Sequence, residues 1–402
     1  MRIMAALGLV GCAGSPLYGQ VVERNTSIID LPRKGYEPRA ITLGSTVIRP
    51  TLDIDATHDD NIFASRHDKV DDEILSVRPR ITAVREGRTL DLDAEVHGDF
   101  LRYRSNSREN VDSFGAAFNA RSMFSRRQAL AAKLGFDRSF ERRSDPEANT
   151  DRSRSPALIN IAEANLSYRY DGNRLGFQAE AGLTKIDYLP IVDNKRDLLT
   201  MTARVRGSVK LRRFAVYVEP FVNKRDFRLP ASRTGVFGAT TVGALAGISF
   251  DLADKLQGNV GTGVFRSNPE GTAADSFTGL ALSGKLTWHP RTRTALSLSL
   301  FRGDVATVRA GALGRVDTRI GLAIDQEARH NLILHAAAGL RKIQYRGSLK
   351  DQRYVSAEGE ARYLIDRHFA VVVAVAYTRR TSSDPEGRFN RLQSTLGLRA
   401  SY

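Results

Sequence analysis

Eighteen successive stretches of about 10 to 14 residues, each alternating apolar and polar side chains, fill residues 46–402. In one of them, Leu92 and Val96 alternate with Asp91 and Asp93. Successive side chains of a β-strand point to opposite faces, so this order gives one apolar face and one charged face. An apolar face suits lipid and a charged face suits water, and the combination is typical of a transmembrane β-barrel.

The ends of these stretches divide the chain into predicted strands. They lie at residues 46–57, 73–84, 89–104, 111–124, 128–141, 158–171, 174–188, 198–211, 214–226, 237–252, 256–266, 277–288, 292–302, 314–326, 331–345, 352–365, 368–379 and 389–402. No linker separates them into domains. We therefore predict an all-β fold, a single antiparallel transmembrane β-barrel of about 18 strands, with both termini periplasmic because the strand number is even.

The connections between the predicted strands alternate in length. Every second connection is tight, as at residues 87–88 and 212–213. The intervening ones are longer and polar, notably residues 58–72, 142–156 and 228–235. We predict short turns on the periplasmic side and long loops outside the cell, where long polar loops are mobile.

The first residues have the composition of a targeting segment. Residues 1–19 have a short positive start, an apolar run and then small residues, which predicts a secretory signal peptide. Cys12 is the only cysteine, and residues 9–12 also resemble a lipoprotein lipobox. We favour cleavage near Gly19 over lipidation, because the apolar run is short and a barrel needs no second anchor. Residues 20–45 are predicted to form a periplasmic N-terminal extension or a small plug, with a disordered tail as the alternative for the first half.

Charge is the second informative property of the chain. The formal net charge is +15, which in a soluble protein would suggest nucleic-acid binding, but an exported chain meets no nucleic acid. Alternation places one set of basic residues inside the barrel, namely Arg78, Arg80, Arg204, Arg206, Lys210, Arg319, Arg341 and Arg362. It places an acidic ladder there too, namely Asp91, Asp93, Glu95 and Asp99. Basic rings favour anions. Alternatively, these charges pair across the barrel and stiffen it.

Catalytic and metal-binding patterns find little support. The seven histidines occur in no nucleophile motif, and His97 and His335 are predicted to be solvated lumen residues. Residues 59–61 and 71–72 are rich in Asp and Asn, whose oxygens could hold calcium. Asp and Asn also cap turns through their own backbone, and we favour this structural interpretation. The sequence therefore predicts no enzyme, no cofactor and no metal, and Pro79 is expected to mark a bulge or an edge-like position.

Aromatic residues cluster near the predicted strand ends, where the girdles of a membrane barrel lie. They are Phe100, Tyr103, Tyr168, Tyr170, Tyr188, Trp288, Phe301, Tyr345, Tyr363, Phe369, Tyr377 and Tyr402. Tyr402 ends the last strand as an outward residue. It resembles the terminal signal by which the barrel-assembly machinery recognises its substrates.

Several short segments near the start carry a family resemblance. Residues 31–38, 43–45, 50–54, 59–63, 71–72 and 77–81 are similar to the opening of the outer-membrane β-barrel porin family, type 2. The motif residues are Pro50, Asp60, Asn61, Asp72 and Pro79. The specific part spans about residues 32–81, and the chain departs from the family at residues 46–49, where members commonly have an aromatic residue. Members are often associated with exopolysaccharide or capsule export loci, so the resemblance implies an outer-membrane barrel and weakly implies a substrate.

Together these observations predict a bacterial outer-membrane channel that takes part in export of an extracellular polysaccharide. The expected partners are outer-membrane lipid, an acidic polysaccharide and periplasmic export components. One alternative is a general or anion-preferring diffusion porin. Another is a structural or adhesive surface barrel with a closed lumen. A soluble β-sandwich is the remaining fold alternative, disfavoured because it needs no charge-free apolar stripes.

Overall fold

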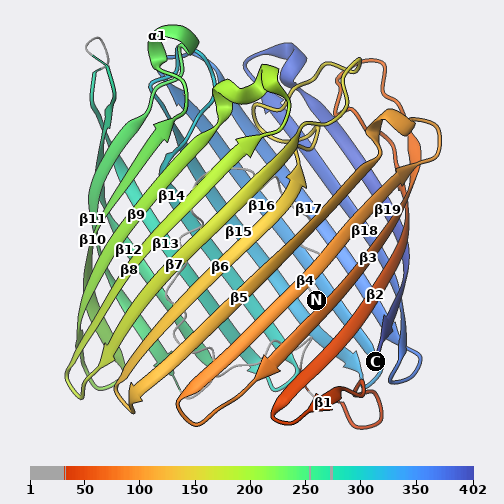
Figure 1. The fold of residues 1–402 in the computed structure, drawn as a ribbon, viewed down its shortest axis with the longest axis vertical. Helices are drawn as coiled ribbons and strands as arrows, with labels where there is room; N and C mark the ends of the chain where they lie inside the picture. Colours follow the sequence, from red (N-terminus) through yellow and green to blue (C-terminus); the bar gives the residue numbers. More distant parts are fainter. Residues whose placement is uncertain (1–30, 32, 253–254, 272–274) are drawn as a thin grey trace.

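A computed structural model describes residues 31, 33–252, 255–271 and 275–402 of the chain (Figure 1). Its strands are β1 (Ile41–Leu43), β2 (Thr46–Asp59), β3 (Asp72–Arg85), β4 (Leu90–Tyr103), β5 (Val111–Ser125), β6 (Gln128–Phe140), β7 (Leu158–Asp171), β8 (Leu175–Tyr188), β9 (Leu198–Lys210), β10 (Phe214–Phe227), β11 (Ala239–Leu252), β12 (Leu256–Pro269), β13 (Phe277–Arg291), β14 (Thr294–Val305), β15 (Gly314–Arg329), β16 (Leu332–Arg346), β17 (Asp351–Leu364), β18 (Phe369–Ser382) and β19 (Phe389–Ser401). Among the described residues, helices are limited to α1 (Ala231–Thr234) and the 3-10 turns η2 (Ser107–Glu109), η3 (Ile191–Arg196) and η4 (Pro385–Gly387). Among the described residues, no helix is long and apolar enough to cross a membrane.

The strands β2 to β19 form one closed antiparallel barrel. Each strand pairs with the next in sequence, and β19 returns to pair with β2. The short β1 adds only to the edge of β2. This confirms the predicted single barrel of 18 strands. The strands are strongly tilted in Figure 1, as barrel closure requires.

Some strands extend beyond their predicted ends. β13 reaches Arg291 and β15 reaches Arg329, each three residues further than expected. In both cases the ladder shifts register near the turn, between Trp288 and Arg291 and between Glu327 and Arg329. A bulge adds a residue to one strand and interrupts the alternation, so the pattern ends before the pairing does.

The two faces of the wall differ in chemistry. On β9, Met201 and Val205 are exposed, while Arg204 between them is partly covered. Glu147, in the connection after β6, pairs with Arg315 on β15 at 3.3 Å. Strands so far apart around a barrel meet only through its interior, so the charged face lines the lumen and the apolar face meets lipid.

Pro79 interrupts a ladder without producing the expected bulge. It pairs in register with Leu52 on β2. On its other side, pairing to β4 stops after Val77 and resumes at Arg80 in the same register. Proline has no N–H to donate, so two pairs are lost while the register is kept. Of the two predicted possibilities, Pro79 therefore occupies the edge-like position, and the bulge does not form.

The two rims of the barrel are distinct. One carries the eight short turns and is called the short-turn rim; the other carries the longer connections and is called the long-loop rim. The C-terminus lies at the short-turn rim, where the Tyr402 backbone N–H donates to the Pro50 carbonyl at 3.3 Å (Figure 1). Residues 33–45 lie there too, because Arg33 pairs with Glu327 on β15 at 3.1 Å. Residues 1–19, with Cys12, and residues 20–30 of the predicted extension lie outside the described residues.

Candidate functional site

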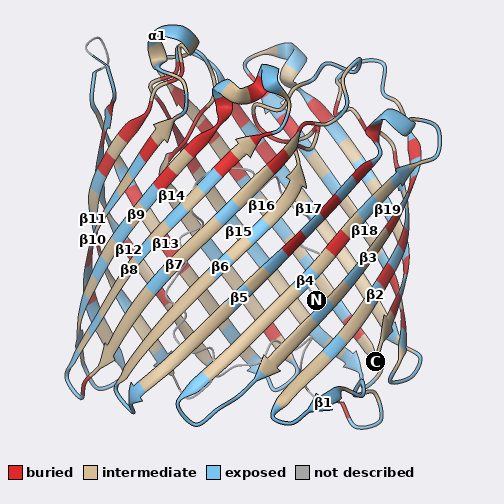
Figure 2. Cartoon of the chain, in the orientation of Figure 1, coloured by how far each residue is buried: buried red, intermediate tan, exposed pale blue. Residues whose placement is uncertain are grey.

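Three long connections fold into the barrel instead of projecting from it. They are residues 60–71, 141–157 and 306–313, called the inner loops below. These loops contain buried residues such as Ile62 and Ala312, whose exposed fractions are only 2% and 1%. Buried residues gather toward the long-loop rim in Figure 2. The prediction that the long connections lie at the surface is therefore met only in part, because these three also pack against the wall while residues such as Arg66 and Arg152 stay exposed.

An apolar cluster fixes two inner loops to the wall. Ala64 from residues 60–71 and Ala312 from residues 306–313 pack together with Ile343 and Tyr345 on β16. Tyr354 on β17 and Phe389 on β19 complete the cluster. Apolar contacts of this kind exclude water, so this part of the rim is filled by side chains.

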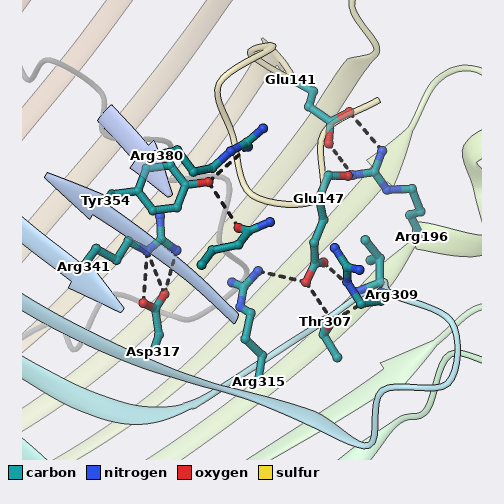
Figure 3. Close-up of polar contacts among 12 residues, drawn as sticks. Glu141, Glu147, Arg196, Thr307, Arg309, Arg315, Asp317, Arg341, Tyr354 and Arg380 are labelled. Carbon is teal, nitrogen blue, oxygen red and sulfur yellow. Dashed lines mark hydrogen bonds and ion pairs between the residues drawn. The ribbon is translucent and has the colours of Figure 1, made fainter. Parts of the chain in front are cut away.

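Glu147 joins two inner loops and the wall (Figure 3). One carboxylate oxygen accepts from the Thr307 hydroxyl at 2.7 Å, and the other accepts from the Val308 backbone N–H at 2.8 Å. Arg315 on β15 pairs with the same carboxylate at 3.3 Å. The side chains of Glu147 and Arg315 are both buried, so this ion pair is shielded from water and salt.

Arg143 holds its own loop together and packs against the first inner loop. Its guanidinium pairs with Glu109 at 2.6 Å and donates to the carbonyls of Asn149 and Asp151. It also lies over the Phe63 ring, 5.8 Å from the centroid. A planar guanidinium with five N–H groups can satisfy several acceptors at once, which suits a loop with many buried carbonyls.

Asp145 is a buried carboxylate in the same loop. Its Oδ2 accepts from the Arg142 backbone N–H at 3.0 Å, while its Oδ1 has no hydrogen-bond partner among the described residues. Burial raises the pKa of Asp145 to about 6, although the nearby Arg142 acts in the opposite direction. The loop therefore contains a group whose charge changes between mildly acidic and neutral pH.

The barrel wall parts between β13 and β14 at the long-loop rim. Their pairing ends at Leu282 and Arg302, although β14 continues to Val305. Beyond this point, the ends of β14 and β15 turn into the lumen, and residues 303–316 are called the inner flap. Val316 on this flap packs against the inner face of β11 to β13 through Leu245 and its neighbours.

Asp304 fastens the inner flap to the inner wall. Its carboxylate is paired with Arg225 on β10 and accepts from the hydroxyls of Thr241, at 2.5 Å, and Ser267, at 2.9 Å. The side chain of Asp304 is fully covered. A small cavity of about 80 Å³ lies between flap and wall, and Phe301 is among its lining residues.

The predicted basic residues occupy the lumen face, and each lies beside a carboxylate of the same wall. Arg204 lies 3.6 Å from Glu180 on β8, and Arg206 lies 2.6 Å from Glu219 on β10. Arg206 also lies over the Tyr217 ring, 4.1 Å from its centroid. These ion pairs run from strand to neighbouring strand. The acidic partner of each arginine could be found from the sequence only if the strand register were known.

The remaining basic residues follow the same rule. Arg319 and Arg341 share Asp317 at 2.7 and 2.6 Å, and Lys210 lies 2.5 Å from Asp171. Arg78 pairs with Asp55, and Arg362 pairs with Glu360 at 2.7 Å. The pairs join adjacent strands or residues two apart on one strand, except Lys210 with Asp171, which reaches past β8 from β9 to β7. They do not span the lumen as one sequence hypothesis supposed.

The acidic ladder lies on β4 and has mostly neutral donors. Asp91 accepts from a backbone N–H at 3.1 Å, Asp93 from a side-chain amide at 2.9 Å and Asp99 from a serine hydroxyl at 3.1 Å. Glu95 instead pairs with Arg80 on β3. The lumen therefore has an acidic side at β4 and paired charges on the other strands named above.

The motif residues join the first strand to the last. The Asp60 carboxylate accepts from the backbone N–H of residue 392 at 2.7 Å, and the Asn61 amide donates to the carbonyl of residue 390 at 2.8 Å. Asp72 accepts from two backbone N–H groups in the connection after β4. Asn61 also bonds the backbone of Ser65 in its own turn, as the favoured capping interpretation supposed, whereas the contacts to residues 392 and 390 tie this turn to the last strand.

Both predicted lumen histidines lie among carboxylates. His97 is 3.2 Å from Asp137, and His335 is 2.7 Å from Asp325 and 3.4 Å from Glu358. Each ring lies between strands of the wall and is partly covered. No group of three side chains able to hold a metal occurs in the described part of the chain.

The predicted aromatic girdle needs correction. Phe100, Trp288, Tyr363, Phe369, Tyr377 and Tyr402 are exposed on the lipid-facing side. Tyr168 and Tyr170 share that face and are half-buried. By contrast, Tyr103, Tyr188, Phe301 and Tyr345 face the lumen. A position near a strand end sets the depth of a side chain, whereas odd or even register sets its face.

A closed antiparallel barrel with an apolar outer face and a charged lumen is a porin-like barrel of the bacterial outer membrane. The chain belongs to the family described as "Putative beta-barrel porin 2", whose model matches residues 34–402. This confirms the resemblance seen in the sequence and places the protein in the bacterial outer membrane.

Similar solved structures are outer-membrane proteins of low identity. OpdK from Pseudomonas aeruginosa is 12% identical, over 88% of this chain and 99% of that one, with a TM-score of 0.43. OccK2 (OpdF) from Pseudomonas aeruginosa is 12% identical over 89% and 98%, with a TM-score of 0.48. OccAB3 from Acinetobacter baumannii is 10% identical over 90% and 100%, with a TM-score of 0.46. No curated protein sequence matches the chain.

Proposed function

We propose that the protein is an outer-membrane channel that is closed at rest by its inner loops and opens to pass an acidic polysaccharide out of the cell. In this proposal, the long-loop rim faces the outside and both termini face the periplasm. The protein performs no chemistry, and the driving force comes from periplasmic export components.

The observation that carries the proposal is the interlocked packing of the three inner loops. Glu147 binds residues of a second inner loop, and Arg152 binds the first through the Ser65 hydroxyl at 2.7 Å. A barrel of this strand number has an aqueous lumen unless loops fill it. Loops tied by buried ion pairs and an apolar cluster are expected to stay in place until a partner or substrate displaces them.

The orientation has separate support. Short turns and long loops segregate to opposite rims, which in single-chain barrels correspond to the periplasmic and outer sides. Tyr402 also lies on the lipid-facing side at the short-turn rim, where assembly machinery acting from the periplasm would meet it.

The substrate class rests on the family resemblance and on lumen charge. Arg204, Arg206 and Lys210 lie on one strand and face the lumen. Their carboxylate partners are fixed on the nearby strands β7, β8 and β10, so a mobile polyanion can replace these contacts one by one as it passes. Such a surface lets an acidic polymer slide because no single contact is strong.

An anion-preferring diffusion porin is the second candidate, and the same basic residues favour it. The two candidates differ in resting conductance. A diffusion porin is open without a partner, whereas a closed channel needs its loops removed or displaced.

The deciding experiment combines a deletion strain with purified protein. We expect deletion to reduce extracellular polysaccharide, and wild-type protein in planar bilayers to give little steady current. A variant with residues 142–156 replaced by a short glycine-serine linker should give large conductance. Unchanged polysaccharide in the deletion strain, together with large wild-type conductance, would establish the porin and reject export.

A further inference from the structure

A basic cluster lies on the lipid-facing side of the barrel near the long-loop rim. Lys342 on β16 is directly opposite Arg353 on β17. Arg379 on β18 is opposite Val355, two residues along from Arg353 on the same face. Arg353 and Arg379 are exposed, and Lys342 is half-buried. The adjacent residues Arg341 and Arg380 face the lumen. The strand register therefore places the three cluster residues on the opposite, lipid-facing side.

The arrangement is unfavourable for the isolated protein. Like charges directly opposite each other on adjacent strands repel, and the cost grows where a low-dielectric membrane lies close by. Lys342, Arg353 and Arg379 make no ion pair with any described residue. A counter-charge from outside the chain would turn this repulsion into attraction.

Several other basic residues on the lipid-facing side of the same rim are neutralised within the protein, whereas Arg138 and Arg266 bond to a side-chain amide and a hydroxyl. On the strands β3 to β5, β8 and β10, each lies beside a carboxylate of its own or a neighbouring strand. The pairs are Arg102 with Asp112 at 2.6 Å, Arg104 with Glu73 at 2.6 Å, Lys185 with Asp187 at 2.8 Å, and Lys224 with Asp226 at 3.2 Å. The cluster on β16 to β18 differs from these in having three cations and no acid partner.

Apolar side chains continue directly from the cluster toward the middle of the wall. Val355 and Tyr377 are exposed on the same face, followed by Val375 and Val373 on β18. A ligand that contacts both the basic cluster and the apolar surface beside it needs anionic groups at the level of Arg353. It also needs acyl chains that extend from there toward the middle of the wall. A free anion would use only the first part.

We propose that Lys342, Arg353 and Arg379 bind the phosphate groups of an anionic glycolipid in the outer leaflet of the membrane. Arginine matches phosphate oxygens with paired N–H groups, and lysine adds a point charge. The tyrosine ring of Tyr377 lies at the depth where sugar headgroup and acyl chain meet, which suits an amphipathic aromatic side chain. The assignment of the leaflet rests on the proposed orientation, whereas the binding chemistry does not.

The test compares two triple variants of the full-length protein refolded in detergent. One variant changes Lys342, Arg353 and Arg379 to Gln. The control changes Arg102, Lys185 and Lys224 to Gln and so removes the same charge from paired positions of the same rim. Heat-modifiable mobility on gels establishes that each variant has folded.

Binding is measured by native mass spectrometry with four probes. These are a bisphosphorylated acylated glycolipid, its monophosphorylated form, phosphatidylglycerol and inorganic phosphate. We expect wild type and control to retain the bisphosphorylated glycolipid, the cluster variant to lose about tenfold in affinity, and the monophosphorylated form to bind more weakly.

Three outcomes overturn the proposal. They are equal retention by both triple variants, equal binding of phosphatidylglycerol, which indicates general attraction to anionic lipid, and displacement of the glycolipid by inorganic phosphate at equal concentration. If the triple variant does not refold, the single change Arg353→Gln must still weaken glycolipid binding relative to Arg102→Gln. Surface labelling of the loop at Leu349, which is fully exposed, tests the orientation independently. A periplasmic result there with glycolipid binding intact rejects the orientation and its leaflet but keeps the binding site.

Discussion

The Arg315 guanidinium lies 3.3 Å from the Glu147 carboxylate, although Arg315 belongs to β15 and Glu147 to the connection after β6. This contact crosses the interior of the barrel and holds residues 141–157 inside it. It is therefore the most direct target for testing whether the inner loops close the lumen.

Replacing Glu147 by Gln should open the channel. The change removes the charge that pairs with Arg315 and weakens the bonds from Thr307 and Val308. Breaking a buried ion pair costs about 3 to 5 kcal/mol. Here this cost destabilises the closed state, in which residues 141–157 are packed inside the barrel. Single-channel recording should show longer and larger openings than wild type, while Glu386→Gln, in an exposed connection elsewhere, should behave as wild type.

Acidification should favour the closed state through Asp145. Its pKa is raised to about 6 in the packed loop, so this loop binds a proton more tightly than a solvated loop does. Stability of the packed loop therefore rises as pH falls from about 6 toward the ordinary pKa near 4, and the burial penalty is constant above 6. The shift in the pKa of Asp145 from its ordinary value near 4 to about 6 corresponds to a change of about 3 kcal/mol in the stability of the packed loop.

The measurement is open probability at pH 4.5 and pH 7.5. Wild type should open less at the lower pH, and Asp145→Asn should open rarely at both, because an amide is neutral throughout. A pH response that persists unchanged in Asp145→Asn would assign it to another group.

Cysteine pairs should detect the parted wall between β13 and β14. Cysteines at Thr241 and Asp304 should form a disulfide, because these side chains are in hydrogen-bond contact at 2.5 Å. Cysteines at Leu280 and Asp304 would be ladder partners if the pairing of β13 with β14 continued in register, but it ends at Leu282 and Arg302. Oxidation of the second pair in place of the first would mean that the inner flap lies in the wall.

Arginine on the lipid-facing side should block insertion. Val205→Arg and Leu398→Arg place a charge on exposed apolar positions, at a cost of about 2 to 4 kcal/mol near the bilayer midplane. Ser208→Arg, at a lumen-facing position of β9, is the matched control. Outer-membrane amounts of heat-modifiable protein measure the effect, and equal amounts for all three would contradict the register.

Neutralising Arg204, Arg206 and Lys210 together should lower transport without lowering protein level. These side chains supply the local positive charge that concentrates anions in the lumen. Surface polysaccharide and anion-to-cation permeability are the two measurements. The triple change of Arg102, Lys185 and Lys224 to Gln removes equal charge from the lipid-facing side and should leave both unchanged.

The sequence by itself determined the barrel. Alternation has a period of two wherever a strand separates lipid from water, so Val205 and Arg204 could be assigned to opposite faces without any tertiary information. The number of strands, the order of short and long connections, and the family resemblance follow from the same local pattern. Pairing of each strand with its neighbour then fixed the closed sheet.

Only the tertiary structure decided where the long connections go. Arg143, Asp145 and Glu147 are charged, and charge in a connection ordinarily indicates solvent. Arg143 and Glu147 are buried because partners such as Glu109 and Arg315 come from other segments and are brought close only when the barrel closes, whereas Asp145 is enclosed with them and bonds within its own loop. The same holds for Asp304 and the inner flap. Alternation is a local property of a strand, whereas the partner of a loop charge depends on closure of the whole barrel, and so only the folded chain reveals it.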